Sequence, residues 1–168
     1  MATMTEPKDL LMHELGDLLY AERRFLTATR RMVGETKDAG IRSRLEQHLK
    51  ETEMQISRLE KAFAAIGEKA KAEKCPAAIG LREEHDSFKS EEKPSQPLLE
   101  AFDLGSGLRV EHYEIAAYRT AIAIAKALGE AECASILKES LAEEEDMANF
   151  LEASAPAALK NLFAAAQA

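Results

Sequence analysis

The chain has 168 residues and a formal net charge of −8, from 30 Asp and Glu against 22 Lys and Arg. This acidic balance argues against nucleic acid as a partner, because binding phosphates needs a basic face. Hydrophobic residues make up 46% of the chain, which contains only 8 Gly, 5 Pro and no Trp. Since Ala, Leu, Glu and Lys predominate among the rest, length and composition predict one all-α domain spanning residues 1–168.

The same sequence contains no sign of a membrane segment. No stretch approaches the roughly 20 apolar residues that cross a bilayer. The start, MATMTEPKDLLMHEL, lacks the basic residues and apolar run of a secretory signal. Cys75 and Cys133 form no CxxC pair, which is typical of free thiols in a reducing compartment. We therefore expect a cytoplasmic protein that does not bind membranes.

In the first half of the chain, apolar residues recur at alternating intervals of four and three, the period of a helix that buries one face. This period predicts helices over residues 7–37 and 41–66, separated by a turn at 38–40 and ended by Gly67. The inward positions of the first helix are Leu11, Leu15, Leu18, Glu22, Phe25, Thr29 and Met32.

The second half begins with a crossover over residues 68–95, where the periodicity weakens and Lys, Glu and Ser dominate. A short helix over 76–91 is expected inside it, because a structureless loop of this length is rare in a compact domain. A crossover this long lets the second and third bundle helices run parallel. Two more helices are expected over 96–128 and 131–153.

These elements predict a ferritin-like four-helix bundle, in which two helix pairs are joined by one long crossover. The core bundle covers about residues 8–153. The appendage of residues 154–168 is expected to form a short helix after Pro156 that need not pack well.

A carboxylate occupies a core position of the third bundle helix. The inward positions of this helix are Leu104, Leu108, Glu111, Ile115, Tyr118, Ile122 and Ala125. A lone ionised carboxylate in the interior costs several kcal/mol, so it must be protonated, paired or bound to a metal. Glu22 takes the matching position in the first helix, which indicates a shared site rather than an isolated error of register.

Di-iron and di-manganese bundles use one Glu from each of two helices and a Glu-x-x-His from each of the other two. Glu22 and Glu111 fit the single positions, and Glu51 and Glu143 fit the others, although Met54 and Asp146 replace the histidines. His48, one turn before Glu51, offers an imidazole, and Glu114, one turn after Glu111, offers a further carboxylate. Oxygen ligands with imidazole suit iron or manganese. The predicted ligands are Glu22, His48, Glu51, Glu111, Glu114 and either Glu143 or Glu144.

Each of these residues also has a purely structural interpretation. Glu22 and Glu111 would instead pair with nearby arginines, namely Arg23, Arg24, Arg109 or Arg119. His48 would be a core histidine that hydrogen-bonds a neighbouring carboxylate. Residues 143–145 are three glutamates in a row, and such a run is usually a solvated face. No catalytic residue can be named from the sequence.

Five stretches of the sequence resemble the YciF/YciE-type family of bacterial stress proteins and together cover most of residues 10–152. They are LLMHELGDLLYAERRFLTATRRM, HLKETEMQISRLEKAFAAIGEKA, KCPAAIGL, RVEHYEIAAYRTA and SILKESLAEEED. The resemblance implies a ferritin-like bundle with an inserted crossover helix, a homodimer, and a rubrerythrin-like centre of two iron ions, with manganese as the alternative metal. It also implies a role in the stress response.

Residues and resemblance together predict a metal-binding stress protein whose iron reacts with oxygen or peroxide, as in a di-iron oxidoreductase. The alternative is a structural or interaction protein with a degenerate or redox-inert metal site, and the two differ in whether the carboxylates bind a redox-active metal. Iron storage is a third, less favoured function, because it would require the short chain to assemble into a cage.

Overall fold

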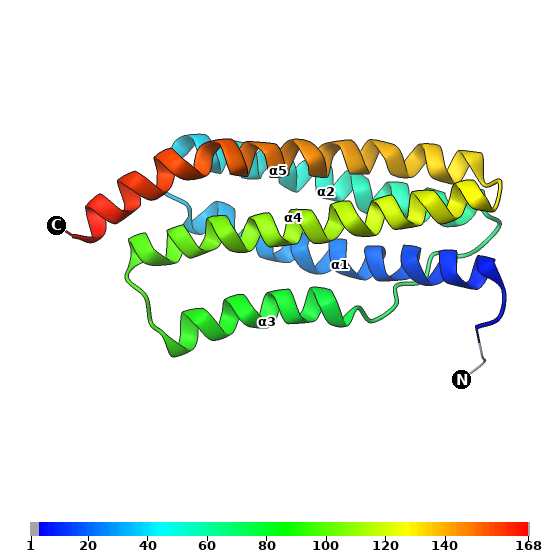
Figure 1. The fold of residues 1–168 in the computed structure, drawn as a ribbon, viewed down its shortest axis with the longest axis horizontal. Helices are drawn as coiled ribbons and strands as arrows, with labels where there is room; N and C mark the ends of the chain where they lie inside the picture. The colour runs from blue at the N-terminus through cyan, green and yellow to red at the C-terminus, as the bar shows by residue number, and fades with distance from the viewer. Residues whose placement is uncertain (1–3, 168) are drawn as a thin grey trace.

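The structure, a computed structural model, describes residues 4–167, so residues 1–3 and 168 of the predicted domain lie outside the described part. Figure 1 shows its architecture, in which the regular elements of residues 4–167 are all helices. The helices are α1 (Pro7–Glu35), α2 (Ala39–Ala65), α3 (Pro76–Glu91), α4 (Gln96–Ala127) and α5 (Ala131–Ala166).

Four of these helices form a bundle in which each contacts two neighbours, in the order α1, α2, α5, α4 and back to α1. The fifth, α3, lies outside against α4 and α1. Helices α2 and α4 run in the same direction, as the long crossover requires (Figure 1). The predicted all-α bundle with a crossover helix is therefore confirmed. None of the helices over residues 4–167 has the length and apolar character needed to cross a membrane.

The helix ends follow from local chemistry. The Asp9 carboxylate accepts a hydrogen bond from the Glu6 amide (3.1 Å), and the Asp38 carboxylate accepts one from the Ile41 amide (2.9 Å). Both bonds satisfy amides that a helix start leaves unpaired. After α2, Gly67 adopts φ 76°, a left-handed conformation that costs glycine little. The crossover helix spans the predicted residues 76–91.

The prediction for the C-terminal end was wrong. Helix α5 continues through Pro156 to Ala166 instead of ending near residue 153. A proline inside a helix removes one backbone hydrogen bond and typically costs about 3 kcal/mol. Here the residues beyond it gain apolar contacts: Leu159 and Leu162 pack against a cluster of buried residues at the end of the bundle. That cluster consists of Leu45, Leu104, Met147 and Leu151.

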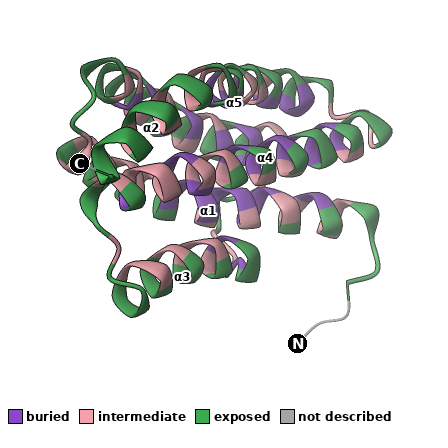
Figure 2. Ribbon diagram, turned by 60° about the vertical axis from the view of Figure 1, so that its left-hand side comes forward, coloured by how far each residue is buried: buried purple, intermediate pink, exposed green. Residues whose placement is uncertain are grey.

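A small apolar cluster around Ala21 and Ala78 joins α1 to α3, and two further apolar clusters have a polar layer between them. One cluster contains residues 11–19 of α1 and 59–66 of α2, together with residues of α4 and α5. The other lies around Leu45 and Met147, toward the opposite end. The buried polar residues lie between these two clusters along each of the four helices. Figure 2 shows that the buried residues line the inside of the bundle, whereas α3 is mostly half-buried or exposed.

Gly16 allows the crossover to pass close to α1. The Glu73 amide donates a hydrogen bond to the Gly16 carbonyl oxygen (3.0 Å). A Cβ atom on Gly16 would lie 2.9 Å from the Lys71 carbonyl oxygen and 2.7 Å from the Glu73 Cγ. The Lys71 carbonyl oxygen can move away only if the crossover backbone moves with it, which would break the hydrogen bond from Glu73 to Gly16. Position 16 therefore requires glycine.

We predict that Gly16→Ala lowers the free energy of unfolding by about 1–2 kcal/mol, because the added methyl group overpacks the crossover. The control is Gly105→Ala, in a helix interior where a Cβ would meet nothing within 4 Å. There alanine should raise stability by up to about 1 kcal/mol through its higher helix propensity. Urea denaturation of both variants is the measurement, and equal effects would contradict the prediction.

Candidate metal centre

Three buried side chains from three helices converge in the polar layer. His48 of α2, Glu111 of α4 and Glu144 of α5 each offer a ligand atom, and these atoms all lie within 4.8 Å of one another. The His48 Nε2 atom is 3.5 Å from the Glu111 Oε1 atom. Their exposed fractions are 4%, 3% and 0%, so bulk water does not reach them. This arrangement brings one imidazole and two carboxylates to a single point.

Two further carboxylates lie beside this group. Glu22 of α1 is buried and accepts a hydrogen bond from the Tyr118 hydroxyl. Glu114 of α4 is buried one turn after Glu111. The charge of Glu22 raises the pKa values of Glu111 and Glu114, and the charges of Glu111 and Glu144 act on Glu114 in the same direction. The structure thus brings together Glu22, His48, Glu111, Glu114 and Glu144; we call these five residues the carboxylate cluster.

Several oxygens of the cluster have no hydrogen-bond partner among the described residues. They are Oε2 of Glu111, Oε1 of Glu114 and both carboxylate oxygens of Glu144. Leaving a buried polar atom unpaired typically costs about 1–3 kcal/mol, and more if it is charged. A proton or a cation would remove this cost. Carboxylate oxygens with one imidazole nitrogen form a donor set that fits iron or manganese.

The protonation of the cluster follows from its burial. Burial raises the pKa of Glu111 to about 7, and the charge of Glu22 contributes in the same direction. Burial also holds the pKa values of Glu22, Glu114 and Glu144 well above the usual range of a carboxyl, with mutual repulsion as a further cause. These groups therefore keep their protons to higher pH than an ordinary carboxyl does, and a divalent cation that binds them displaces those protons.

Glu51 does not join the cluster but holds His48 in place. Its carboxylate lies 3.4 Å from the His48 Nδ1 atom and accepts hydrogen bonds from Arg44 (2.8 Å) and Gln47 (2.7 Å). The contact with His48, followed by the one with Arg44, lowers the pKa of Glu51 to about 2. An ionised carboxylate at Nδ1 leaves Nε2 facing the cluster, the arrangement found around metal-binding histidines.

Glu143 is likewise bound outside the cluster. The Arg58 guanidinium donates to its two carboxylate oxygens at 2.6 and 2.8 Å, and the Gln55 amide nitrogen donates to it at 3.0 Å. Successive residues of a helix point about 100° apart, so only one of two neighbouring glutamates can face the cluster. The structure favours Glu144 over Glu143 for this position. Metal binding by any of the predicted residues stays a prediction.

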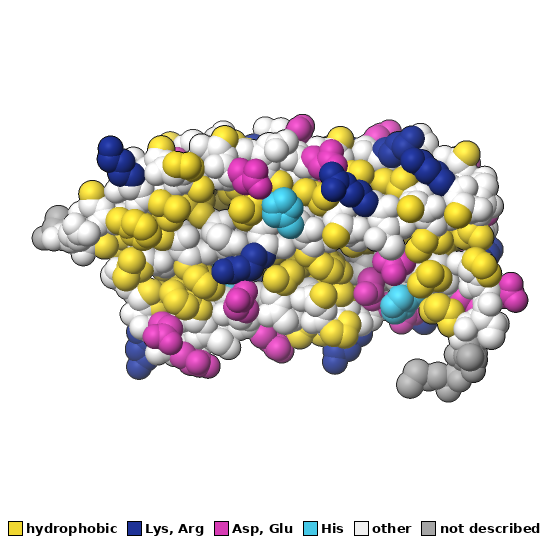
Figure 3. Space-filling model, in the orientation of Figure 1, with side chains coloured by type: hydrophobic (Ala, Val, Ile, Leu, Met, Phe, Trp, Pro, Cys, Tyr) yellow, Lys and Arg dark blue, Asp and Glu magenta, His cyan; other side chains and the backbone are white. Residues whose placement is uncertain are grey.

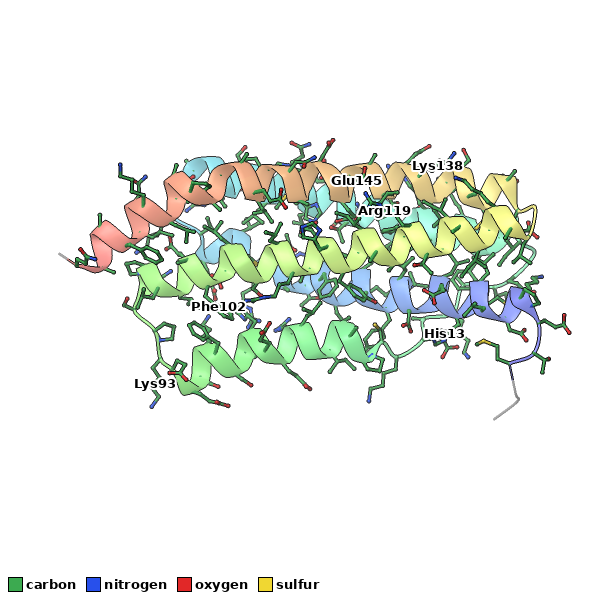
Figure 4. The ribbon with its side chains drawn as sticks, in the orientation of Figure 1. His13, Lys93, Phe102, Arg119, Lys138 and Glu145 are labelled. Carbon is green, nitrogen blue, oxygen red and sulfur yellow. The ribbon has the colours of Figure 1, made fainter. Side chains whose placement is uncertain are left out.

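The arginines that the sequence offered as partners for Glu22 and Glu111 pair elsewhere. Arg23 bonds Glu60, Arg24 bonds Tyr20, Arg109 bonds Glu84 and Arg119 bonds Glu145. Figure 4 shows Arg119 and Glu145 on neighbouring helices at the surface. Arginine pairing therefore does not neutralise the two buried glutamates.

Two further buried polar residues lie in the same layer, and sequence reasoning missed the first of them, Gln55. Gln55 and Ser140 have exposed fractions of 0%, and each has an oxygen without a hydrogen-bond partner among the described residues. Gln55 follows His48 by two helical turns, and Ser140 precedes Glu144 by one, so each shares a face with a cluster residue. This spacing was the available signal. Sequence reasoning also missed Arg44 and Arg58, because their pairing with Glu51 and Glu143 is seen only in the folded chain.

We predict that Arg58→Ala lowers the free energy of unfolding by about 1–3 kcal/mol, because it leaves the Glu143 carboxylate without its charged hydrogen-bond donor. The side chains of this pair are only 15% and 20% exposed. Arg119→Ala is the control, since that pair is 63% and 40% exposed and should contribute less than about 1 kcal/mol. Denaturation midpoints that fall equally in both variants would contradict the assignment.

We also predict that the metal-free protein loses stability as pH rises. The folded state binds the Glu111 proton with a pKa of about 7, against an ordinary value of 4.5. Its stabilising contribution is therefore complete below about pH 4.5 and lost progressively up to about pH 7, at roughly 1 kcal/mol per pH unit. Glu111→Gln should flatten this dependence in urea denaturation. An unchanged slope would show that Glu111 is ionised throughout this range.

Comparison with known proteins places these observations in a family. A family model described as "Domain of unknown function (DUF892)" matches residues 6–165. Protein YciF of Escherichia coli (strain K12) is 34% identical over 139 residues, which is 82% of this chain and 82% of that protein.

Solved structures agree with this assignment. The E. coli stress protein YciF superposes with a TM-score of 0.85 at 30% identity, covering 94% of this chain and 99% of that one. YcfI from Rhodopseudomonas palustris gives 0.84 at 35% identity, covering 88% and 94%. Protein XCC3681 from Xanthomonas campestris, at 22% identity and a TM-score of 0.79, shares the fold. The predicted resemblance is thus confirmed, and the chain belongs to the DUF892 family and is of the YciF type.

Proposed function

We propose that the carboxylate cluster binds a redox-active divalent metal, with two iron ions as the first choice and manganese as the alternative, and that the loaded protein reacts with oxygen or peroxide during stress. The observation that carries this proposal is the set of buried, unpaired carboxylate oxygens of Glu111, Glu114 and Glu144 beside the His48 Nε2 atom. A related protein of E. coli is described as a stress protein. A homodimer and a cytoplasmic address belong to the same proposal.

The side chains have separate tasks in this proposal. His48, Glu111 and Glu144 would hold the metal, with Glu22 and Glu114 completing the oxygen ligands. When bound, two ferrous ions supply the two electrons that peroxide takes up on reduction to water. The apolar clusters on either side of the layer exclude bulk water.

Two residues that are not proposed ligands act on the ligands: one orients an imidazole and the other favours the ionised form of a carboxylate. Glu51 orients His48 through its Nδ1 atom. Tyr118 donates a hydrogen bond to Glu22, which favours the ionised carboxylate that a metal needs.

A structural role is the second candidate, and one observation favours it. Glu51 and Glu143 pair with Arg44 and Arg58, so they are not free to bind two metal ions as the standard glutamates do. Protons on the remaining carboxyls would then neutralise the layer without a metal. The R. palustris relative has been proposed to be a structural protein. In that case the polar layer would serve to align the helices.

We predict that the wild-type chain binds ferrous ions under anaerobic conditions and that Glu144→Gln lowers the affinity by about tenfold or more, because a neutral amide replaces a charged ligand. The matched control is Glu145→Gln, which alters the next residue, a surface glutamate paired with Arg119. Isothermal titration and metal analysis of the purified proteins are the measurements. Addition of peroxide to the loaded wild type should then produce the absorbance of ferric iron.

Three outcomes separate the two candidates. Absence of metal binding by the wild type would rule out the metal-binding function and leave the structural one. Binding that Glu144→Gln and Glu145→Gln weaken equally would place the metal outside the cluster. Tight binding without any spectral change on peroxide addition would show a redox-inert centre.

A further inference from the structure

A cavity of about 150 Å³ extends from the carboxylate cluster toward the end of the bundle that α5 overhangs. Its inner lining includes the buried side chains of His48 and Glu111, and its outer lining includes the exposed Arg31 and Asn161. Every one of the five helices contributes to the wall. On α4 the lining runs from Glu100 to Glu111, about 16 Å at the rise of an α-helix, so the cavity is elongated.

The wall of this cavity is largely apolar. Buried or half-buried lining residues include Phe25, Met32, Leu45, Leu104, Met147 and Leu151. The stretch of α5 beyond Pro156 adds Ala158 and Leu162. Figure 3 shows apolar side chains gathered over this part of α5, next to the start of α4. An engineered cavity of similar volume with an apolar lining binds benzene, so this one has room for about six carbon atoms.

The charges around the outer end select against an anionic ligand. Four carboxylates line the cavity there, against two guanidinium groups. The carboxylates are Glu35, Asp38, Glu100 and Asp103, and the guanidinium groups are those of Arg31 and Arg82. Both guanidinium groups already pair with Asp86, at 3.4 and 2.8 Å. Glu35 is likewise paired with Lys89 (3.2 Å) and Asp103 with His85 (2.8 Å). An incoming carboxylate would therefore have to break an existing ion pair in a region where carboxylates outnumber guanidinium groups.

We propose that this cavity is a binding site for an uncharged, chain-shaped molecule whose single polar end lies against His48 and Glu111 and whose apolar body extends toward α5. The polar end of the ligand would be a hydroxyl or hydroperoxyl group, because such a group hydrogen-bonds an imidazole or a carboxyl. The inner end of the cavity offers both groups, whereas the rest of its wall is largely apolar. The binding of such a molecule does not depend on a metal. An alkyl hydroperoxide as the oxidant is an extension that rests on the proposed function.

Gly107 provides a direct test because it lines the cavity on α4. A Cβ atom on this residue would lie 3.5 Å from Leu151 Cδ1, an ordinary contact, so a larger side chain can be added and would fill the cavity. Gly105, two residues earlier in the same helix, does not line the cavity, and a Cβ there meets nothing within 4 Å. Leucine at either position also removes a helix-weakening glycine, which matches the pair for local propensity.

The experiment titrates 1-hexanol into the metal-free, ¹⁵N-labelled full chain and follows amide chemical shifts. We expect saturable shifts concentrated in α4 between residues 104 and 111 and in α5 between 147 and 162. Gly107→Leu should weaken binding roughly tenfold or more, since tenfold corresponds to about 1.4 kcal/mol of lost contact. Gly105→Leu should bind like the wild type, and hexanoate should bind more weakly than 1-hexanol.

The result can overturn the proposal in three ways. Shifts that do not saturate, or that fall mainly on residues that do not line the cavity, would show that the cavity takes no such ligand. Unchanged binding by Gly107→Leu would place the ligand elsewhere. Ala158→Leu, on α5, is the second variant, and it decides the same point if Gly107→Leu does not fold. Equal binding of hexanoate would remove the preference for an uncharged molecule. Because no metal is present, these outcomes are independent of whether the cluster binds iron.

Discussion

Burial of several carboxyl groups in one layer is the constraint on which the rest of the structure depends. Glu22, Glu111, Glu114 and Glu144 lie between two apolar clusters, where an ionised carboxylate without a partner costs several kcal/mol. The bundle can keep this layer only if protons or a cation neutralise it. The raised pKa values and the unpaired oxygens are two expressions of the same desolvation. A metal would satisfy both at once.

The glutamates of the layer are neutralised in two distinct ways. Glu51 and Glu143 lie at its edges, where Arg44 and Arg58 can reach them with part of their side chains still in water. Glu111 and Glu144 are buried deeper and pair with no arginine of residues 4–167, so a proton or a small cation would neutralise them. This division explains why His48 connects the two sets: its Nδ1 atom faces Glu51 and its Nε2 atom faces Glu111.

The C-terminal part of α5 extends beyond the four-helix core and covers one end of the bundle. Continuing through Pro156 costs one backbone hydrogen bond, but it covers the end of the bundle with Leu159 and Leu162. The same segment encloses the outer half of an apolar cavity that ends at His48 and Glu111. The polar layer is therefore accessible from one end of the bundle through a passage that favours uncharged molecules. This links the carboxylate cluster to the surface without exposing it to bulk water.

The sequence by itself determined the helices, the crossover and the burial of Glu22 and Glu111, because a period of four and three specifies which face of a helix turns inward. It also proposed His48 and Glu114 as ligands, because His48 lies one turn before Glu51 and Glu114 lies one turn after Glu111. Only the tertiary structure decided that Glu144 faces the cluster while Glu143 pairs with Arg58, because that choice depends on side chains of another helix. It likewise decided that α5 continues past Pro156, since the contacts that offset the proline include Leu45 of α2 and Leu104 of α4, far away in the chain. Periodicity shows which face of one helix a side chain lies on, whereas a site depends on which side chains of different helices meet.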